Sequence, residues 1–297
     1  MNINYLWKAS DIKINSSNIN RFSKQIEKKF NLNFYKKFKS LWNWSIENNE
    51  LFWSEVWDFS NIKGYKGNRI LNKSKLFYKN KFFPDAKLNF AENLISFKSK
   101  EIAIFSLKEN GAEDFITWEN LFNNVCKFSD YLNKINIKKG DVVAAYVPNT
   151  IETIVTFLGS TKNGCIWSSC SPDFGPQGVI ERFQQIEPKI LITCDHYFYN
   201  GKKINILDNI ETITKSIPSI QNVIVFSYDN TQIDKKYLSY YDVLKNSKKN
   251  TNFQKFDFNH PVYILYSSGT TGIPKCIVHG SGNALIEQKK ELLIHCN

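Results

Sequence analysis

Hydroxyl residues, glycines and one lysine are concentrated between Ser267 and Lys275, in the run Ser-Ser-Gly-Thr-Thr-Gly-Ile-Pro-Lys. Glycine allows backbone conformations closed to other residues and brings amide N–H groups close to a ligand. Successive N–H groups in such a turn form a concave site for an anion. We therefore interpret this run, hereafter the phosphate loop, as a binding site for a polyphosphate. The residues assigned to it are Ser267, Ser268, Gly269, Thr270, Thr271, Gly272 and Lys275.

The phosphate loop differs from the Walker A loop, in which Gly-Lys-Ser/Thr ends the motif. Here Gly272 is followed by Ile-Pro-Lys, and the apolar residues after Lys275 predict a second strand rather than a helix. The order is therefore strand, loop, strand. A Ser/Gly-rich hairpin turn without a ligand is the alternative, but it does not explain the order of the residues.

Alternating strands and helices precede the phosphate loop. Apolar runs predict strands at 101–107, 142–147, 165–168, 189–194, 222–227 and 262–266. Helical spacing predicts helices after Thr117, over 151–161 and over 177–186. Such alternation is typical of an α/β fold with a mainly parallel sheet covered by helices.

The N-terminal part has a different pattern. Residues 1–20 are polar, 21–59 have helical spacing, and 63–81 form an extended connection. Four tryptophans within 42–57 indicate a packing surface more than a ligand site. We expect a Trp-rich helical cap and connection over 1–97, and a nucleotide-binding domain over 98–297.

Composition narrows the class of protein. No apolar run of the 297 residues reaches the ~18 needed to span a bilayer, and 1–20 lack a signal-peptide core, so the cytoplasm is expected and a membrane partner is not. Six scattered cysteines and four histidines indicate reduced thiols and no metal site. The net charge of +11 raises the question of nucleic acid, but only three residues are arginine and the lysines are dispersed. Small-molecule substrates are expected instead.

The phosphate loop resembles the signature loop of the AMP-forming acyl-CoA synthetases, also called adenylate-forming enzymes. That resemblance implies that the loop holds the β- and γ-phosphates of ATP while a carboxylate attacks the α-phosphate. It implies catalytic roles for Thr271 and Lys275, with ATP, Mg²⁺ and CoA as the cofactors or co-substrates. The Mg²⁺ ligand is not identifiable in the sequence.

Two further runs, 84–94 and 163–175, resemble the acetoacetyl-CoA synthetases within that family. They imply acetoacetate as the acid; acetate, propionate or another short acid is the alternative, as is a nucleotide-binding chain without catalysis. No Gly-x-Ser-x-Gly elbow supports a serine nucleophile in 163–175, so the serines there, Ser168 among them, are expected to satisfy backbone groups.

The basic turn at Gly201, Lys202 and Lys203 lies where relatives of this family have a loop that meets the CoA phosphates. Lysine lacks the bidentate geometry of arginine, so a solvated charged turn is an equal alternative. In the family the chain continues well beyond this length. We therefore expect the C-terminal part of the same enzyme as a missing partner, no activity of this chain alone, and unburied side chains at Leu285, Leu292 and Leu293.

Overall fold

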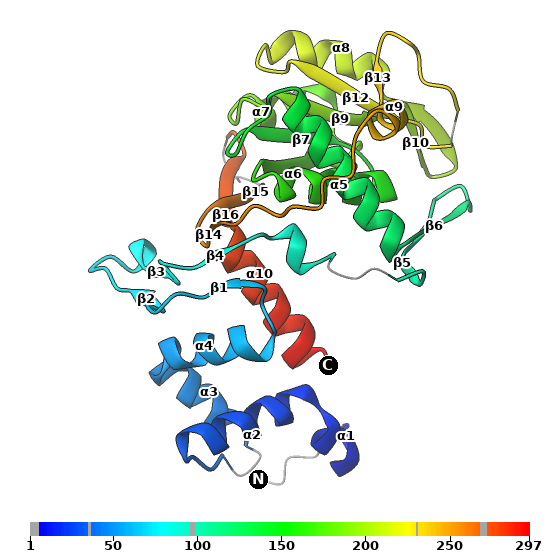
Figure 1. Ribbon diagram of the computed structural model, residues 1–297. Coiled ribbons are helices and arrows are strands. Elements are labelled where there is room, and N and C mark those ends of the chain that lie inside the picture. Colours follow the sequence, from blue (N-terminus) through cyan, green and yellow to red (C-terminus); the bar gives the residue numbers. More distant parts are fainter. Residues whose placement is uncertain (1–5, 35–36, 96–98, 230, 268–271) are drawn as a thin grey trace. The chain divides into compact units, whose positions relative to one another are not determined.

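The computed structural model describes residues 6–34, 37–95, 99–229, 231–267 and 272–297 (Figure 1). The chain forms two compact units: Met1–Ala86 with Gly282–Asn297, and Lys87–Ser281. None of the described helices combines the length and apolar character needed to cross a membrane.

The second unit is built on a seven-stranded sheet (Figure 1). Six strands are parallel and the edge strand β16 is antiparallel to β15. The strand order is β13 (Leu238–Ser239), β12 (Asn222–Phe226), β9 (Ile190–Cys194), β7 (Val142–Tyr146), β8 (Ile166–Cys170), β15 (Pro261–Ser267) and β16 (Lys275–Gly280). Val143 to Tyr146 and all of β9 are buried, as expected for parallel strands covered on both faces.

Helices cover this sheet on both sides. From β7 the chain crosses to β8 through α6 and then returns past β7 to β9 through α7. Because parallel crossovers are right-handed, this reversal places α6 and α7 on opposite faces. α5 packs on α6 and α9, whereas α7 packs on α8. The helices are α5 (Trp118–Lys134), α6 (Ile151–Lys162), α7 (Pro176–Phe183), α8 (Leu207–Ser216) and α9 (Tyr240–Lys245).

Smaller elements surround the sheet. β5 pairs with β6, β10 with β11 and β14 with β4, all antiparallel. Their bounds are β4 (Lys87–Leu88), η2 (Ala91–Asn93), β5 (Ile102–Leu107), β6 (Glu113–Thr117), β10 (His196–Tyr199), β11 (Lys202–Asn205) and β14 (Phe256–Asp257).

The first unit is mainly helical, and aromatic rings form its core. Phe22 makes edge contacts with Phe52 and Phe59, and Trp57 packs on Phe83 at a centroid distance of 5.1 Å. Its elements are α1 (Asp11–Ser16), α2 (Asn18–Phe30), α3 (Phe38–Glu47), α4 (Asn49–Phe59), β1 (Gly64–Tyr65), β2 (Leu71–Asn72), η1 (Phe77–Lys79), β3 (Lys81–Phe82), most of α10 (Ser281–Lys290) and the π-helical turn η3 (Glu291–His295).

The predicted fold class is confirmed, with local differences. The polar stretch 1–20 contains α1 and the start of α2, each capped by a serine. The helical stretch 21–59 is divided because Asn31 adopts a left-handed conformation, with φ 53°, and ends α2. Leu285 is fully buried, so its expected exposure was wrong, whereas Leu292 and Leu293 are exposed. The first structural unit joins segments from both ends of the chain. It therefore does not test the predicted domains 1–97 and 98–297, which stay a prediction.

Gly164, two residues before the start of β8, fills a position that excludes a side chain. Its φ is 74°, and a Cβ would lie 2.6 Å from Cζ of the buried Phe256. Left-handed strain of about 1–2 kcal/mol and overpacking of about 1–3 kcal/mol should therefore add in Gly164→Ala. We expect a loss of about 2–5 kcal/mol in the free energy of unfolding, measured by urea titration with tryptophan fluorescence.

Gly140→Ala is the matched control for that variant. Gly140 has φ 88°, but a Cβ there would meet nothing within 4 Å. It therefore has the backbone strain without the steric clash. Equal losses of stability in the two variants would show that the contact with Phe256 is unimportant.

Candidate functional site

The phosphate loop connects the antiparallel pair β15 and β16, which confirms the predicted order of strand, loop and strand. Ser267, the last residue of β15, is paired with Lys275, the first residue of β16. The hairpin register therefore brings these two predicted site residues face to face at the mouth of the loop. Four further predicted residues, Ser268, Gly269, Thr270 and Thr271, lie outside the described residues.

Gly272 and Lys275 have the properties that anion binding requires. Gly272 is exposed, with φ 101°, and a Cβ there would meet nothing within 4 Å. The backbone conformation is therefore what favours glycine. Lys275 is exposed and, among the described residues, forms no ion pair, so its ammonium group is available to a ligand.

Gln185, just beyond α7, positions the residues on both sides of Lys275. Its Nε2 donates to the carbonyl of Pro274 at 2.9 Å, and its Oε1 accepts from the thiol of Cys276 at 3.6 Å. These contacts fix the start of β16, and hence the base of the lysine side chain. Nothing in the sequence around Gln185 distinguished it from a surface residue of the helix.

Ser168 of β8 has the backbone-satisfying role predicted for it. Its buried hydroxyl donates to the carbonyl of Ile264 at 2.9 Å and lies 3.0 Å from the hydroxyl of Tyr266. Burial raises the pKa of Tyr266 above its usual range, so this phenol stays neutral and serves as a hydrogen-bonding group. Ser168 therefore holds β15, and with it the start of the phosphate loop, against β8.

Arg182 of α7 adds a second cation to this edge of the sheet. Its guanidinium lies 4.2 Å from the ring centroid of Phe174 and 5.8 Å from that of Tyr266, and one of its nitrogens donates to the carbonyl of Gly178 at 2.7 Å. Stacking on aromatic rings favours a fixed orientation of a guanidinium. The scarcity of arginine in this chain was the only sequence signal that pointed to it.

Tyr146 secures the loop that follows β8. Its hydroxyl lies 2.9 Å from the carbonyl oxygen of Pro172 and 2.6 Å from that of Phe174. Burial raises the pKa of Tyr146 to about 12, so the hydroxyl remains a donor at neutral pH. This loop and the phosphate loop both follow the carboxyl ends of neighbouring parallel strands, the edge at which open α/β sheets bind ligands.

The predicted CoA residues form a separate feature. Asn200 and Gly201, with φ 49° and 72°, form the two-residue turn between β10 and β11, which is the Asn-Gly hairpin signature. Lys202 and Lys203 are adjacent in β11 and so face opposite sides of the hairpin. Lys203 forms an ion pair with Asp229 at 3.2 Å, whereas Lys202 is exposed. The sheet order separates β9, which leads into this hairpin, from β15 by β7 and β8.

The cysteines are all free, and four of them are buried. Burial raises the pKa of Cys165 and of Cys170 to about 12. These two thiols therefore pack within the hydrophobic core of the second unit.

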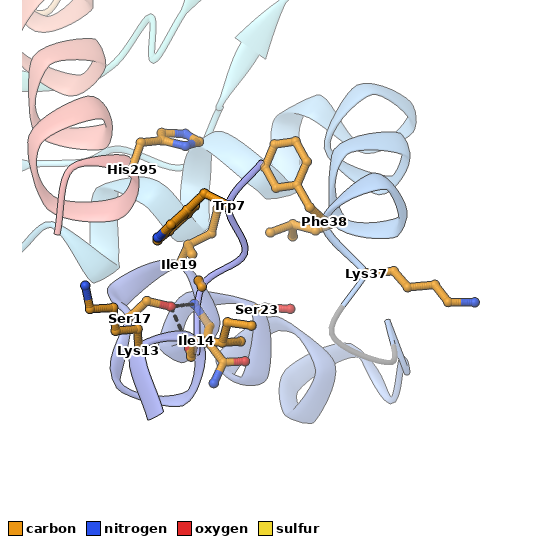
Figure 2. Close-up of a pocket in the computed structure, with 12 residues that line it drawn as sticks. Trp7, Lys13, Ile14, Ser17, Ile19, Ser23, Lys37, Phe38 and His295 are labelled. Atoms are coloured by element: carbon orange, nitrogen blue, oxygen red, sulfur yellow. Dashed lines mark hydrogen bonds between the residues drawn. The ribbon is translucent and has the colours of Figure 1, made fainter. Parts of the chain in front are cut away.

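A cavity of about 480 Å³ lies in the first unit (Figure 2). Apolar side chains from α1, α2 and α3, including Ile14, Ile19 and Leu41, line it together with Trp7. Among the described residues, its lining contains three basic side chains and no acidic one. None of the predicted site residues that the structure describes lies in this lining.

Comparisons with known proteins agree on one group. The family model for "AMP-binding enzyme" matches residues 92–292. An acetoacetyl-coenzyme A synthetase of Rhizobium meliloti (strain 1021) is 37% identical over 258 residues, covering 86% of this chain and 40% of that protein. A malonamoyl-CoA synthetase of Penicillium aethiopicum is 33% identical over 311 residues, covering 97% of this chain and 42% of that protein.

A solved structure gives the same result for the fold. The acetoacetyl-CoA synthetase from Streptomyces lividans superposes with a TM-score of 0.92 at 29% identity, covering 98% of this chain and 45% of that protein. The chain thus spans less than half the length of the relatives that it matches.

Proposed function

Because this chain belongs to the AMP-binding enzyme family, we propose that it forms the phosphate-binding part of an acetoacetate–CoA ligase. The single observation that supports this most is the β15–β16 hairpin, in which Ser267 faces Lys275 across the mouth of a loop of Ser, Thr and Gly residues. The whole reaction converts acetoacetate, ATP and CoA into acetoacetyl-CoA, AMP and pyrophosphate.

The first step transfers the adenylyl group. A carboxylate oxygen of acetoacetate attacks the α-phosphorus of MgATP, and the bond to the pyrophosphate oxygen breaks. Charge then accumulates on the departing pyrophosphate. Donors that are already oriented stabilise such charge without reorganisation. We assign this role to Lys275, to the hydroxyls of Thr270 and Thr271, and to the loop amides.

The second step transfers the acyl group. The thiolate of CoA attacks the acyl carbonyl carbon, and the bond to AMP breaks. We propose that Gly201, Lys202 and Lys203 contribute to the CoA phosphates, with the exposed Lys202 as the stronger candidate because Lys203 is already paired with Asp229. Mg²⁺ would enter with ATP, and the hydroxyl of Ser267 is an oxygen donor of the hard type that it prefers.

We propose that the substrate is a short acid with a second carbonyl group at carbon 3. Acetoacetate carries a methyl ketone there, and malonamate, the acid named by the Penicillium relative, carries an amide of nearly the same shape. A pocket that hydrogen-bonds this second carbonyl is left unpaired by acetate. Ligation of malonamate is therefore the second candidate function.

We expect acetoacetate or malonamate to exceed acetate and propionate in kcat/KM by about 10²-fold or more in the complete enzyme, since loss of a required hydrogen bond is strongly discriminating. Pyrophosphate release with each acid at equal concentration measures this preference. Butyrate is the matched control, because it has the chain length of acetoacetate without the carbonyl. Equal turnover of butyrate and acetoacetate would contradict the assignment.

The remaining proposals rest on the family and on the share of the relatives' length that this chain covers. The rest of the enzyme would supply further contacts to the nucleotide and CoA, so we propose it as the partner that this chain requires. The proposed partners are otherwise small molecules in the cytoplasm, without nucleic acid or membrane. A chain that binds ATP without turnover is the non-catalytic alternative, and ATP binding without pyrophosphate release by the complete protein would identify it.

A further inference from the structure

A buried imidazole lies between two carboxylates at the carboxyl ends of β9 and β12. His196 is 3% exposed, and its Nδ1 lies 2.8 Å from Oδ1 of Asp195. Its Nε2 lies 3.3 Å from Oδ2 of Asp229. Phe198 and Tyr228 surround the ring, each at a centroid distance of 5.7 Å.

Asp195 is fully engaged as an orienting group. Its Oδ1 accepts from the backbone amides of His196 and Tyr228 at 2.8 and 3.0 Å, and its Oδ2 accepts from the hydroxyl of Ser227 at 3.0 Å. The carboxylate therefore has a fixed position 2.8 Å from Nδ1, and we assign the ring proton to Nδ1. Carboxylates orient metal-binding histidines in this way.

Nε2 then carries a lone pair that no neighbour satisfies. Within the described part of the chain, this buried atom has no hydrogen-bond partner, although Oδ2 of Asp229 is 3.3 Å away. Two acceptor atoms at this separation repel each other unless a proton or a metal cation lies between them. Two ligands about 2.0–2.1 Å from a tetrahedral Zn²⁺ lie roughly 3.3–3.4 Å apart, which matches the observed distance.

The surroundings of His196 contain room for water and a positive charge that would compete with a metal ion. A cavity of about 290 Å³, lined by Asp195, His196, Lys203 and Asp234 among others but not by Asp229, gives water access to the imidazole side of the site. The ammonium of Lys203 lies 3.2 Å from the same oxygen of Asp229, but its side chain is 53% exposed and can move away. Lys203 is thus a competitor for the oxygen that a metal would use.

We propose that Nε2 of His196 and Oδ2 of Asp229 bind a divalent transition-metal ion of the Zn²⁺ type, with Asp195 as the group that orients the histidine. The ion would tie the start of the β10–β11 hairpin to the segment after β12. This site is separate from the phosphate loop, and its existence does not depend on the ligase activity proposed above.

The probe is Co²⁺, titrated into the 297-residue chain and followed by its visible absorption, with Zn²⁺ as the displacing ion. All proteins carry Cys296→Ser, because the exposed Cys296 beside His295 is a second place where such an ion can bind. We expect saturable binding. Asp229→Asn should weaken it by about tenfold or more, and Asp195→Asn by about 10–100-fold.

Two variants make the test specific. Asp234→Asn changes a carboxylate of the same cavity that is not a proposed ligand, and should leave the affinity unchanged. Lys203→Met should tighten binding, because it removes the competing ammonium. Zn²⁺ should also raise the Tm of the parent protein by more than that of Asp229→Asn. Absence of saturable binding, equal affinities of Asp229→Asn and Asp234→Asn, or weaker binding by Lys203→Met would overturn the proposal.

Discussion

Replacing Thr271 or Lys275 with alanine in the complete ligase should slow pyrophosphate release by about 10²–10³-fold, because each would remove one of the donors that we propose to stabilise the developing charge. Lys275 is exposed and lies at the first position of β16, so its truncation should leave stability within about 0.5 kcal/mol. The defect should therefore appear in catalysis and not in folding. Single-turnover release of pyrophosphate with saturating acetoacetate measures it.

Two controls accompany the loop variants. Ile273→Ala changes an exposed apolar side chain in the same loop and should keep the parent rate. Lys275→Arg keeps the charge and should recover part of the activity lost in Lys275→Ala. Parent rates in both Thr271→Ala and Lys275→Ala would rule out the phosphate-binding assignment.

The 297-residue chain purified by itself should form neither AMP nor acetoacetyl-CoA. It spans 40% of the length of the Rhizobium relative, and closure of a complete active site is what excludes water and assembles the catalytic groups. Loss of the remaining part should abolish both steps instead of weakening one. Product formation from labelled acetoacetate, in a preparation free of host ligase, measures this.

Fusion of this chain to the remaining part of the Rhizobium relative is the positive control, and should restore turnover if the chain is folded. Circular dichroism of the chain alone would separate an inactive folded protein from an unfolded one. Acetoacetyl-CoA formation by the unfused chain would show that the additional part is unnecessary.

Strong local patterns made the main elements predictable. The buried strands β7 and β9 are nearly continuous apolar runs, and α5 begins at the N-cap Thr117 that its sequence indicates. The hairpin around the phosphate loop was predictable because its two apolar runs flank a turn. Elements whose character depends on tertiary burial were missed: α9 lies in a polar stretch, yet Tyr240 and Val243 are buried.

The residues that position the site through hydrogen bonds were harder to predict from the sequence, because their partners are distant along the chain. Gln185 contacts Pro274 across 89 residues, and Ser227 contacts Asp195 across 32. No local period marks such contacts. The proximity of His196 and Asp229 is likewise not marked in the sequence, since only the parallel register of β9 and β12 brings Asp229 beside His196.

The pairing of β8 with β15 has a consequence for synthesis. The hydroxyl of Ser168 and the carbonyl of Ile264 are 96 residues apart, which a ribosome translating about 5–20 residues per second needs roughly 5–20 s to bridge. During that interval the nascent chain carries β8 with its outer edge unpaired, and an unpaired edge is a template for strands of other chains. A chaperone bound to the nascent chain after β8 has been made and before β15 has been made would protect this edge of β8, beside which the phosphate loop is later formed.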